Sequence, residues 1–131
     1  MARILVVDDD QAVLEMTAVI LRKSGHEVAT AINGAVAYPL WCRFRHDLII
    51  SDCEMPEIGG IELARMVYAQ DPNLPIILTS GRHCPSAWTG LFLTKPFHMN
   101  SLINLVNRVL GGRSHTPPRT STPPPAAPAP A

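Results

Sequence analysis

The stretch Asp47-Leu48-Ile49-Ile50-Ser51-Asp52 decides the fold, because a carboxylate follows directly on a short and almost wholly apolar run. The segments at 4–7, 75–80 and 91–95 have the same design, and 26–31 is a weaker version of it. A strand that is apolar at successive positions is buried on both faces, which is typical of a parallel sheet lying between two layers of helices. The sequence therefore predicts five parallel strands.

Segments with helical periodicity separate these strands. Apolar residues recur at helical spacing from Val13 to Leu21, and Gly25 suits the end of that helix. Residues 61–67 and 102–110 repeat the pattern, with Gly111-Gly112 as the expected stop of the last helix. Residues 35–45 predict another helix, with a kink or late start at Pro39. Alternation of this kind predicts an α/β fold, a doubly wound five-stranded parallel sheet in a three-layer α/β/α sandwich.

Composition narrows the class of protein. The 131 residues suit one domain, and 11 basic residues balance 11 acidic ones. A net charge of zero provides no broad field for nucleic acid or an anionic membrane, and no apolar run approaches the roughly 18 residues that span a bilayer. Three cysteines without metal-ligand spacing are interpreted as reduced thiols. We expect a cytoplasmic protein that binds neither membrane nor nucleic acid directly.

The composition changes abruptly after Leu110. Residues 111–131 contain seven of the 13 prolines and no large apolar side chain. Such a segment cannot bury enough surface to offset the entropy lost on ordering. The sequence predicts a folded domain over 1–110 and a disordered, proline-rich tail over 111–131, partly in the polyproline II conformation. The tail is either a solvated terminus or a proline-rich docking motif.

Reactive side chains stand where the predicted strands end. Asp8-Asp9-Asp10 follows the first strand, Asp52 ends the third, Thr79-Ser80 ends the fourth and Lys95-Pro96 follows the fifth. In open parallel sheets the functional groups gather at the carboxyl ends of the strands. Clustered carboxylates repel one another unless a cation joins them, and Mg²⁺ favours such oxygen ligands. A carboxylate can also attack phosphorus, while lysine and threonine bind phosphoryl oxygens. These residue types predict a phosphoryl-transfer site.

Five strings carry a resemblance to a known family. They are ILVVDDD (4–10), SGHEV (24–28), DLIISDCEMPEIGGIEL (47–63), PIILTSG (75–81) and LTKPF (93–97). In this order and spacing they resemble the receiver domains of bacterial response regulators, which have a flavodoxin-like fold. The resemblance covers about residues 3–110, which is nearly all of the part expected to fold.

The resemblance implies a role for each matched residue. Asp52 would be the phosphorylated aspartate, and Lys95 would pair with the phosphate. Thr79 would bind the phosphoryl group and move towards it, while Phe92 stands at the aromatic position that turns inward when Thr79 moves. The implied Mg²⁺ ligands are the carboxylates of Asp8, Asp9 and Asp52, with the backbone carbonyl of Glu54.

The implied function is that of a single-domain response regulator. It would take phosphate from a histidine kinase or phosphotransfer protein in a Mg²⁺-dependent phosphorelay, and would signal by binding an unidentified output protein. We expect a signalling module and not an enzyme. From the residues alone, the alternative interpretations are a core side chain for Phe92 and an ordinary strand threonine for Thr79.

The chain departs from the family pattern between Thr79 and Lys95. This stretch is shorter than usual, contains Pro85 and lacks an apolar helical stripe. The helix expected there, the fourth of the family, is predicted to be shortened or missing, which puts the family's usual output surface in doubt. Trp88, in this stretch, is expected to pack or to contact a partner. Ser80, where the family commonly has alanine, is expected to alter access to the phosphate.

Three other functions remain open. A phosphate sink or relay shuttle needs no output surface of its own. A small Mg²⁺-dependent phosphatase of the haloacid-dehalogenase type also uses an aspartate nucleophile, but needs a second aspartate where Glu54 stands. A pseudo-receiver, which binds partners without being phosphorylated, commonly has a damaged acidic cluster, and here the cluster is intact.

Overall fold

The structure is a computed structural model that describes residues 2–113, with side chains described up to Gly111. The tail predicted over 111–131 therefore lies almost entirely outside the described residues. The domain boundary predicted after Leu110 stays a prediction.

Five strands and four helices alternate within residues 2–113, with one exception. In chain order they are β1 (Arg3–Val7), α1 (Gln11–Lys23), β2 (Glu27–Ala31), α2 (Gly34–Phe44), β3 (Leu48–Asp52), α3 (Gly60–Tyr68), β4 (Ile76–Ser80), β5 (Leu91–Thr94) and α4 (Met99–Arg113). The exception is the connection between β4 and β5, which contains no helix. All five strands predicted from the sequence are present.

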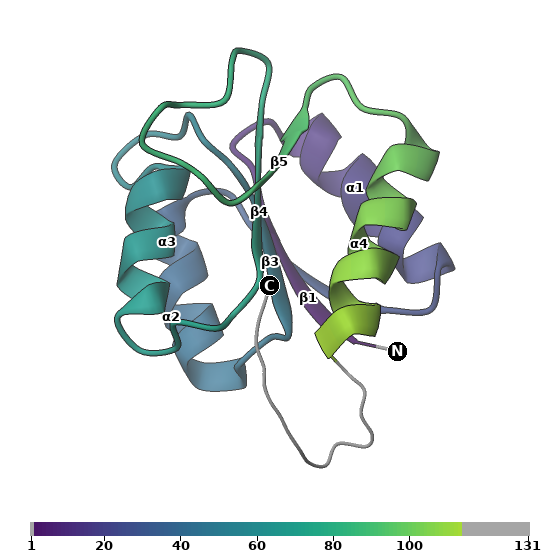
Figure 1. Cartoon of the computed structure of the whole chain (residues 1–131), viewed down its shortest axis with the longest axis horizontal. Coiled ribbons are helices and arrows are strands. Elements are labelled where there is room, and N and C mark those ends of the chain that lie inside the picture. The colour runs from purple at the N-terminus through teal and green to yellow at the C-terminus, as the bar shows by residue number, and fades with distance from the viewer. Residues whose placement is uncertain (1, 114–131) are drawn as a thin grey trace.

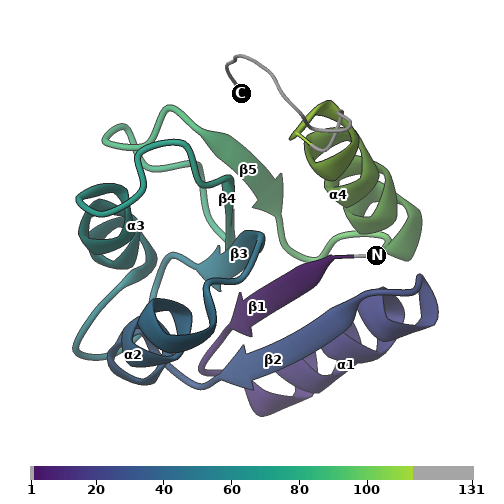
Figure 2. The same ribbon diagram turned by 90° about the horizontal axis from the view of Figure 1, so that it is seen from below.

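The strands form one parallel sheet in the order β2-β1-β3-β4-β5. Helices α2 and α3 cover one face, and α1 and α4 cover the other (Figure 1). Seen from below, the three layers are distinct, with β2 and β5 at the two edges of the sheet (Figure 2). The predicted doubly wound α/β/α sandwich is confirmed.

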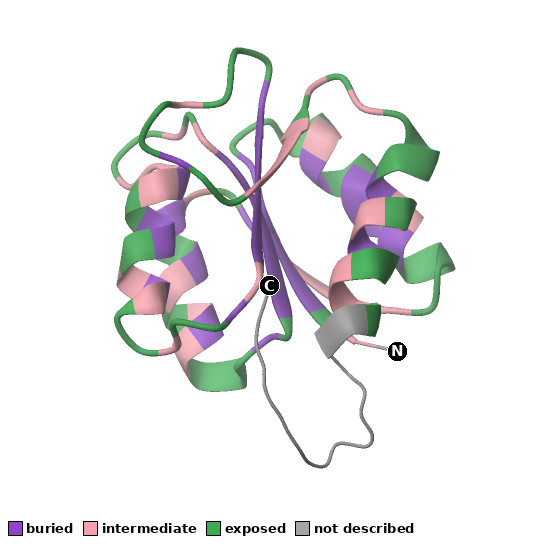
Figure 3. Ribbon diagram, viewed as in Figure 1, coloured by how far each residue is buried: buried purple, intermediate pink, exposed green. Residues whose placement is uncertain are grey.

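Two hydrophobic cores lie on the two faces of the sheet. Along β1, Leu5 and Val7 belong to the core under α2 and α3, whereas Ile4 and Val6 belong to the core under α1 and α4. Because successive side chains point to opposite faces, a strand between two cores has to be apolar at every position. Figure 3 shows the result as a buried central sheet with exposed residues on the outer faces of the helices.

Local signals explain how several of the helices begin and end. The Asp10 carboxylate accepts hydrogen bonds from the backbone N–H groups of Ala12 and Val13, and so caps α1. At the other end, Gly25 adopts a φ of +95°, which glycine tolerates better than other residues. Helix α2 begins at Gly34 and continues through Pro39, so the late start considered for this helix is wrong.

Helix α4 corrects a second expectation. It does not stop at Gly111-Gly112 but continues through both glycines to Arg113. Each glycine costs a helix interior about 1 kcal/mol relative to alanine. Packing of Leu102 and Val106 against the sheet stabilises α4 as a whole.

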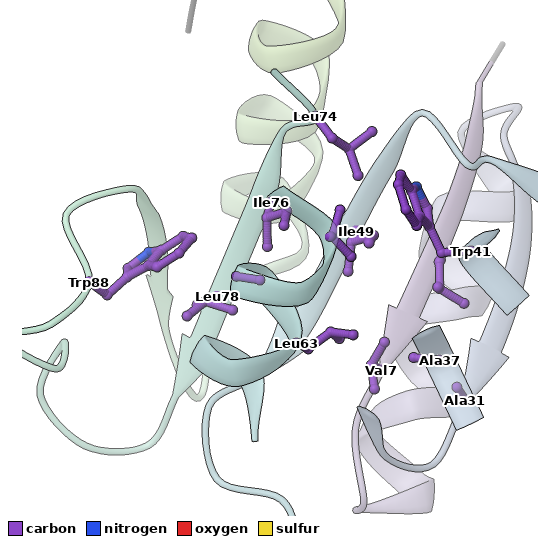
Figure 4. Close-up of a cluster of buried hydrophobic side chains, with 13 residues drawn as sticks. Val7, Ala31, Ala37, Trp41, Ile49, Leu63, Leu74, Ile76, Leu78 and Trp88 are labelled. Carbon is purple, nitrogen blue, oxygen red and sulfur yellow. The ribbon is translucent and has the colours of Figure 1, made fainter. Parts of the chain in front are cut away.

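The connection between β4 and β5, residues 81–90, confirms that the fourth helix of the family is missing. Trp88 from this connection enters the core under α3 and is only 9% exposed (Figure 4). Its ring stacks on Tyr68, with centroids 6.4 Å apart and planes 1° from parallel, and its indole N–H donates to the Leu91 carbonyl at 2.8 Å. Trp88 therefore packs, and the expected partner contact stays a prediction.

Of the helices within residues 2–113, none is both long and apolar enough to cross a membrane.

Candidate functional site

The sheet register brings the predicted site residues to one edge. Asp52 pairs with Thr79 across β3 and β4, and Val7, next to Asp8, pairs with Ser51. Because all strands are parallel, their carboxyl ends share one edge of the sheet. We call this edge, with its loops, the carboxyl edge.

Three aspartates form an acidic cluster at the carboxyl edge. Asp8, Asp9 and Asp52 each present a carboxylate oxygen, and the three oxygens lie within 4.8 Å of one another. Asp8 and Asp52 are 3% and 5% exposed, whereas Asp9 is exposed to solvent. The cluster therefore has two buried members and one that faces water.

Lys95 is the cation nearest to this cluster. Its Nζ lies 2.9 Å from Oδ2 of Asp8 and 3.5 Å from Oδ1 of Asp52. The other oxygen of Asp8 accepts a hydrogen bond from the backbone N–H of Asp10 at 2.9 Å. The peptide bond between Lys95 and Pro96 is cis. Lys95 thus has Asp8 as its closest partner and approaches Asp52 more loosely.

The environment of Asp52 changes its acidity. Burial disfavours the charged form and raises the pKa of the Asp52 carboxyl from 3.8 to about 6. The positive charge of Lys95 opposes this shift, and the negative charges of Asp8 and Glu54 add to it. Oδ1 of Asp52 is buried and has no hydrogen-bond partner within the described part of the chain. A buried carboxylate oxygen of this kind suits a cation or an incoming electrophile.

Thr79 and Phe92 lie on neighbouring strands beside the site. Thr79 is 3% exposed, and its backbone carbonyl accepts a hydrogen bond from the N–H of Cys53 at 2.8 Å. Phe92 is partly buried and packs against the core under α2 and α3. Its position fits a core side chain directly, while the switching roles of both residues stay predictions.

Two glycines let α3 begin close to Asp52. A Cβ atom built on Gly60 would lie 2.5 Å from the Asp52 carbonyl oxygen, and one on Gly59 would lie 2.9 Å from that of Cys53. Side chains at these positions would push the start of α3 away from the loop after β3. The pair Gly59-Gly60 therefore fixes the loop that carries residues 53–58.

The structure reveals one contact that the sequence did not indicate. Ser80 is completely buried, and its hydroxyl lies 2.9 and 3.0 Å from the two carboxylate oxygens of Glu54. The same hydroxyl oxygen accepts the backbone N–H of Arg82 at 3.0 Å. The departure from alanine at position 80 was the only signal in the sequence, and it did not identify Glu54 as the partner.

The donor set fits a divalent cation of the Mg²⁺ type. Two buried carboxylates and one exposed one converge, and the buried Oδ1 of Asp52 has only the 3.5 Å ion pair with Lys95 and no hydrogen bond from the described residues. Mg²⁺ is a hard ion that takes one or two carboxylates and retains waters, which the exposed side of Asp9 allows. No cysteine or histidine belongs to this cluster, so a site for a softer metal is not indicated here.

Comparison with known proteins identifies the family. The model of the response regulator receiver domain matches residues 4–107, so the chain belongs to this family. It is 33% identical over 117 residues to the response regulator receiver protein CpdR of Brucella abortus, covering 84% of this chain and 98% of that protein. It is 36% identical over 121 residues to the transcriptional regulatory protein PrrA of Mycobacterium tuberculosis.

Solved structures agree with this assignment. The chemotaxis protein CheY4 of Vibrio cholerae superposes with a TM-score of 0.77 at 32% identity, covering 83% of this chain and 98% of that one. A signal receiver domain of a histidine kinase from Syntrophus aciditrophicus gives a TM-score of 0.81 at 30% identity, covering 93% and 98%. The match to PrrA covers 87% of this chain but 52% of that protein, so the chain spans about half the length of this relative.

Proposed function

We propose that this receiver domain is phosphorylated on Asp52 by a histidine kinase or a histidine phosphotransfer protein, in a Mg²⁺-dependent phosphorelay. Its output is the binding of a partner protein. The observation that carries the proposal is the buried Oδ1 of Asp52, which has no hydrogen bond from the described residues and lies 3.5 Å from Nζ of Lys95, on a residue of the acidic cluster.

The reaction needs no separate base. One oxygen of the ionised Asp52 carboxylate attacks the phosphorus of a phosphohistidine and forms an O–P bond. The N–P bond breaks, its electron pair stays on the imidazole nitrogen, and that nitrogen takes up a proton. The product is an acyl phosphate on Asp52 and a neutral histidine.

Each neighbouring side chain has a task in this reaction. Asp8, Asp9, Asp52 and the backbone carbonyl of Glu54 would hold Mg²⁺, which when bound neutralises charge on the phosphoryl oxygens. Lys95 would leave Asp8 in part and bind one phosphoryl oxygen, a move of short range because its Nζ already lies 3.5 Å from Asp52. Thr79 would bind another oxygen, and Phe92 would follow the movement of Thr79.

Phosphorylation is tested with acetyl phosphate. We expect the intact mass of the wild-type chain to rise by one phosphoryl group in the presence of Mg²⁺ and to stay unchanged in EDTA. Asp52→Ala should take up none. Equal uptake by Asp52→Ala would contradict the assignment of the nucleophile.

A second function, that of a phosphate sink or relay shuttle, is favoured by the missing helix between β4 and β5. It uses the same chemistry but needs no output surface. The lifetime of the acyl phosphate and the rate of its return to a histidine protein separate the two. Rapid return, with no partner that prefers the phosphorylated form, would favour the sink.

The phosphatase function is less well supported, since that chemistry uses an aspartate as acid and base at the position where this chain has Glu54. The Glu54 carboxylate is hydrogen-bonded to Ser80 and is not one of the oxygens of the acidic cluster. The phosphatase function would be supported if wild type hydrolysed a small phosphoester steadily and Asp52→Asn did not.

A further inference from the structure

Ser80 and Glu54 form a pair at the carboxyl edge that the proposed chemistry does not use. Glu54 stands two residues after the nucleophile, on the loop held by Gly59-Gly60, and Ser80 ends the adjacent strand β4. Both oxygens of Glu54 lie within hydrogen-bond distance of one buried hydroxyl. This contact joins the loop after β3 to the end of β4.

The hydrogen bonding of Ser80 is directional. A serine hydroxyl has a single hydrogen to donate and accepts with its lone pairs. Because its oxygen accepts the N–H of Arg82, the hydroxyl is oriented to donate to Glu54. A hydrogen bond to a charged acceptor is stronger than one between neutral groups, so it favours the conformation in which the exposed Glu54 side chain meets Ser80.

The direction taken by the Glu54 carboxylate matters for the acidic cluster. Within the described residues, the cluster of oxygens within 4.8 Å comprises Asp8, Asp9 and Asp52 and does not include Glu54. Even so, Glu54 is close enough for its charge to contribute to the raised pKa of Asp52. The carboxylate is therefore near the cluster but turned towards Ser80.

We propose that Ser80 is a positioning residue that holds the Glu54 carboxylate out of the metal site, leaving only the backbone carbonyl of Glu54 to face the metal. The inference rests on the proposed function. Mg²⁺ is limited to near-octahedral coordination, so a fourth carboxylate would take a position that a water or a phosphoryl oxygen needs. Ser80 thereby keeps one position open for the phosphoryl donor.

The proposal predicts opposite effects on two measurements. In Ser80→Ala the Glu54 carboxylate is released and becomes an additional ligand. We expect Mg²⁺ to bind about three- to tenfold more tightly by calorimetry, which is the range of a single weak charged contact. Phosphorylation by acetyl phosphate at saturating Mg²⁺ should be slower by a similar factor. Loss of a merely structural hydrogen bond would not strengthen metal binding.

A second substitution identifies the residue through which Ser80 acts. A neutral amide is a poorer Mg²⁺ ligand than a carboxylate, so Ser80→Ala combined with Glu54→Gln should return both measurements to those of Glu54→Gln alone. The matched control combines Ser80→Ala with Glu57→Gln, which removes the same charge from a neighbouring exposed glutamate. This control should behave as Ser80→Ala.

The outcomes separate the inference from the function on which it rests. Suppose that wild type binds Mg²⁺ and is phosphorylated. If Ser80→Ala then binds Mg²⁺ within twofold of wild type, or more weakly, the inference is overturned and the proposed function stands. The inference is also overturned if Glu54→Gln and Glu57→Gln cancel the effect of Ser80→Ala equally. The effect would then depend on the total negative charge near the site and not on Glu54 in particular. A wild-type chain that neither binds Mg²⁺ nor accepts phosphate overturns the proposed function and the inference together.

Discussion

The Lys95 ammonium lies 2.9 Å from the Asp8 carboxylate, closer than its 3.5 Å approach to Asp52, the proposed nucleophile. Only 19% of the lysine side chain and 5% of the Asp8 side chain are exposed, so the pair is largely removed from water. A buried pair is costly to break because the remaining charge has no compensation. Lys95 therefore stabilises the resting site as well as serving the proposed reaction.

Replacing Lys95 should weaken the fold. In Lys95→Ala, Asp8 loses its ion-pair partner and the acidic cluster repels itself, so we expect the free energy of unfolding in EDTA to fall by about 2 kcal/mol. Mg²⁺ should restore part of the loss by replacing the cation. Urea denaturation with and without Mg²⁺ measures both effects. Lys23→Ala, at the exposed end of α1, is the matched control and should change stability by under about 0.5 kcal/mol.

The raised pKa of Asp52 predicts how stability depends on pH. The folded-state pKa of about 6 exceeds the ordinary value of 3.8, so the stabilising contribution is complete below about pH 3.8 and is lost as pH rises through 6. Asp52→Asn should therefore be more stable than wild type at pH 8 without metal, by about 1–3 kcal/mol. The difference should disappear below about pH 4. If the free energies of unfolding of wild type and Asp52→Asn changed in parallel with pH, the raised pKa of Asp52 would not be the cause.

Trp88 should contribute strongly to stability although it lies in a connection without a helix. Trp88→Ala removes the stack on Tyr68 and leaves a cavity, so we expect a loss of about 3 kcal/mol in chemical denaturation. Trp88→Phe keeps a ring against Tyr68 and should lose about 1 kcal/mol. If Trp88→Ala cost less than Trp88→Phe, the packing role assigned to this ring would be wrong.

A methyl group at position 90 tests the same packing from the other side. A Cβ atom on Gly90 would lie 2.6 Å from the Trp88 ring, so the ring would have to shift. We expect Gly90→Ala to lower the free energy of unfolding by about 1–3 kcal/mol and to change the emission of Trp88. Gly81→Ala is the control, since a Cβ atom there meets no neighbour within 4 Å.

The sequence predicted that the side chains of the candidate site lie together, because their placement follows from the strand ends. Asp8, Asp52 and Lys95 each stand at or just after the end of a mainly apolar strand, and a parallel sheet brings such positions to one edge whatever the loops do. The missing helix was predictable in the same way, from a short segment without an apolar stripe. Both the convergence of these side chains and the missing helix follow from the order of strands and helices along the chain.

Contacts that depend on side-chain conformation were not predictable. The bond between Ser80 and Glu54 joins two elements through a rotamer choice, and the sequence contains no pattern for it. Trp88 is buried because the connection turns it into the core beside Tyr68, which composition does not indicate. Gly111-Gly112 signals a helix end locally, but α4 includes both glycines and extends to Arg113, and no contact among the described residues explains the extension.

Binding of beryllofluoride, a mimic of the phosphoryl group, tests the central claim most directly. Amide NMR spectra should change on its addition only when Mg²⁺ is present, with the largest shifts around Asp52, Thr79 and Lys95. Asp52→Asn should show no Mg²⁺-dependent response to beryllofluoride. A wild-type spectrum that stays unchanged with Mg²⁺, or an Asp52→Asn spectrum that responds as wild type does, would contradict phosphorylation of this chain on Asp52.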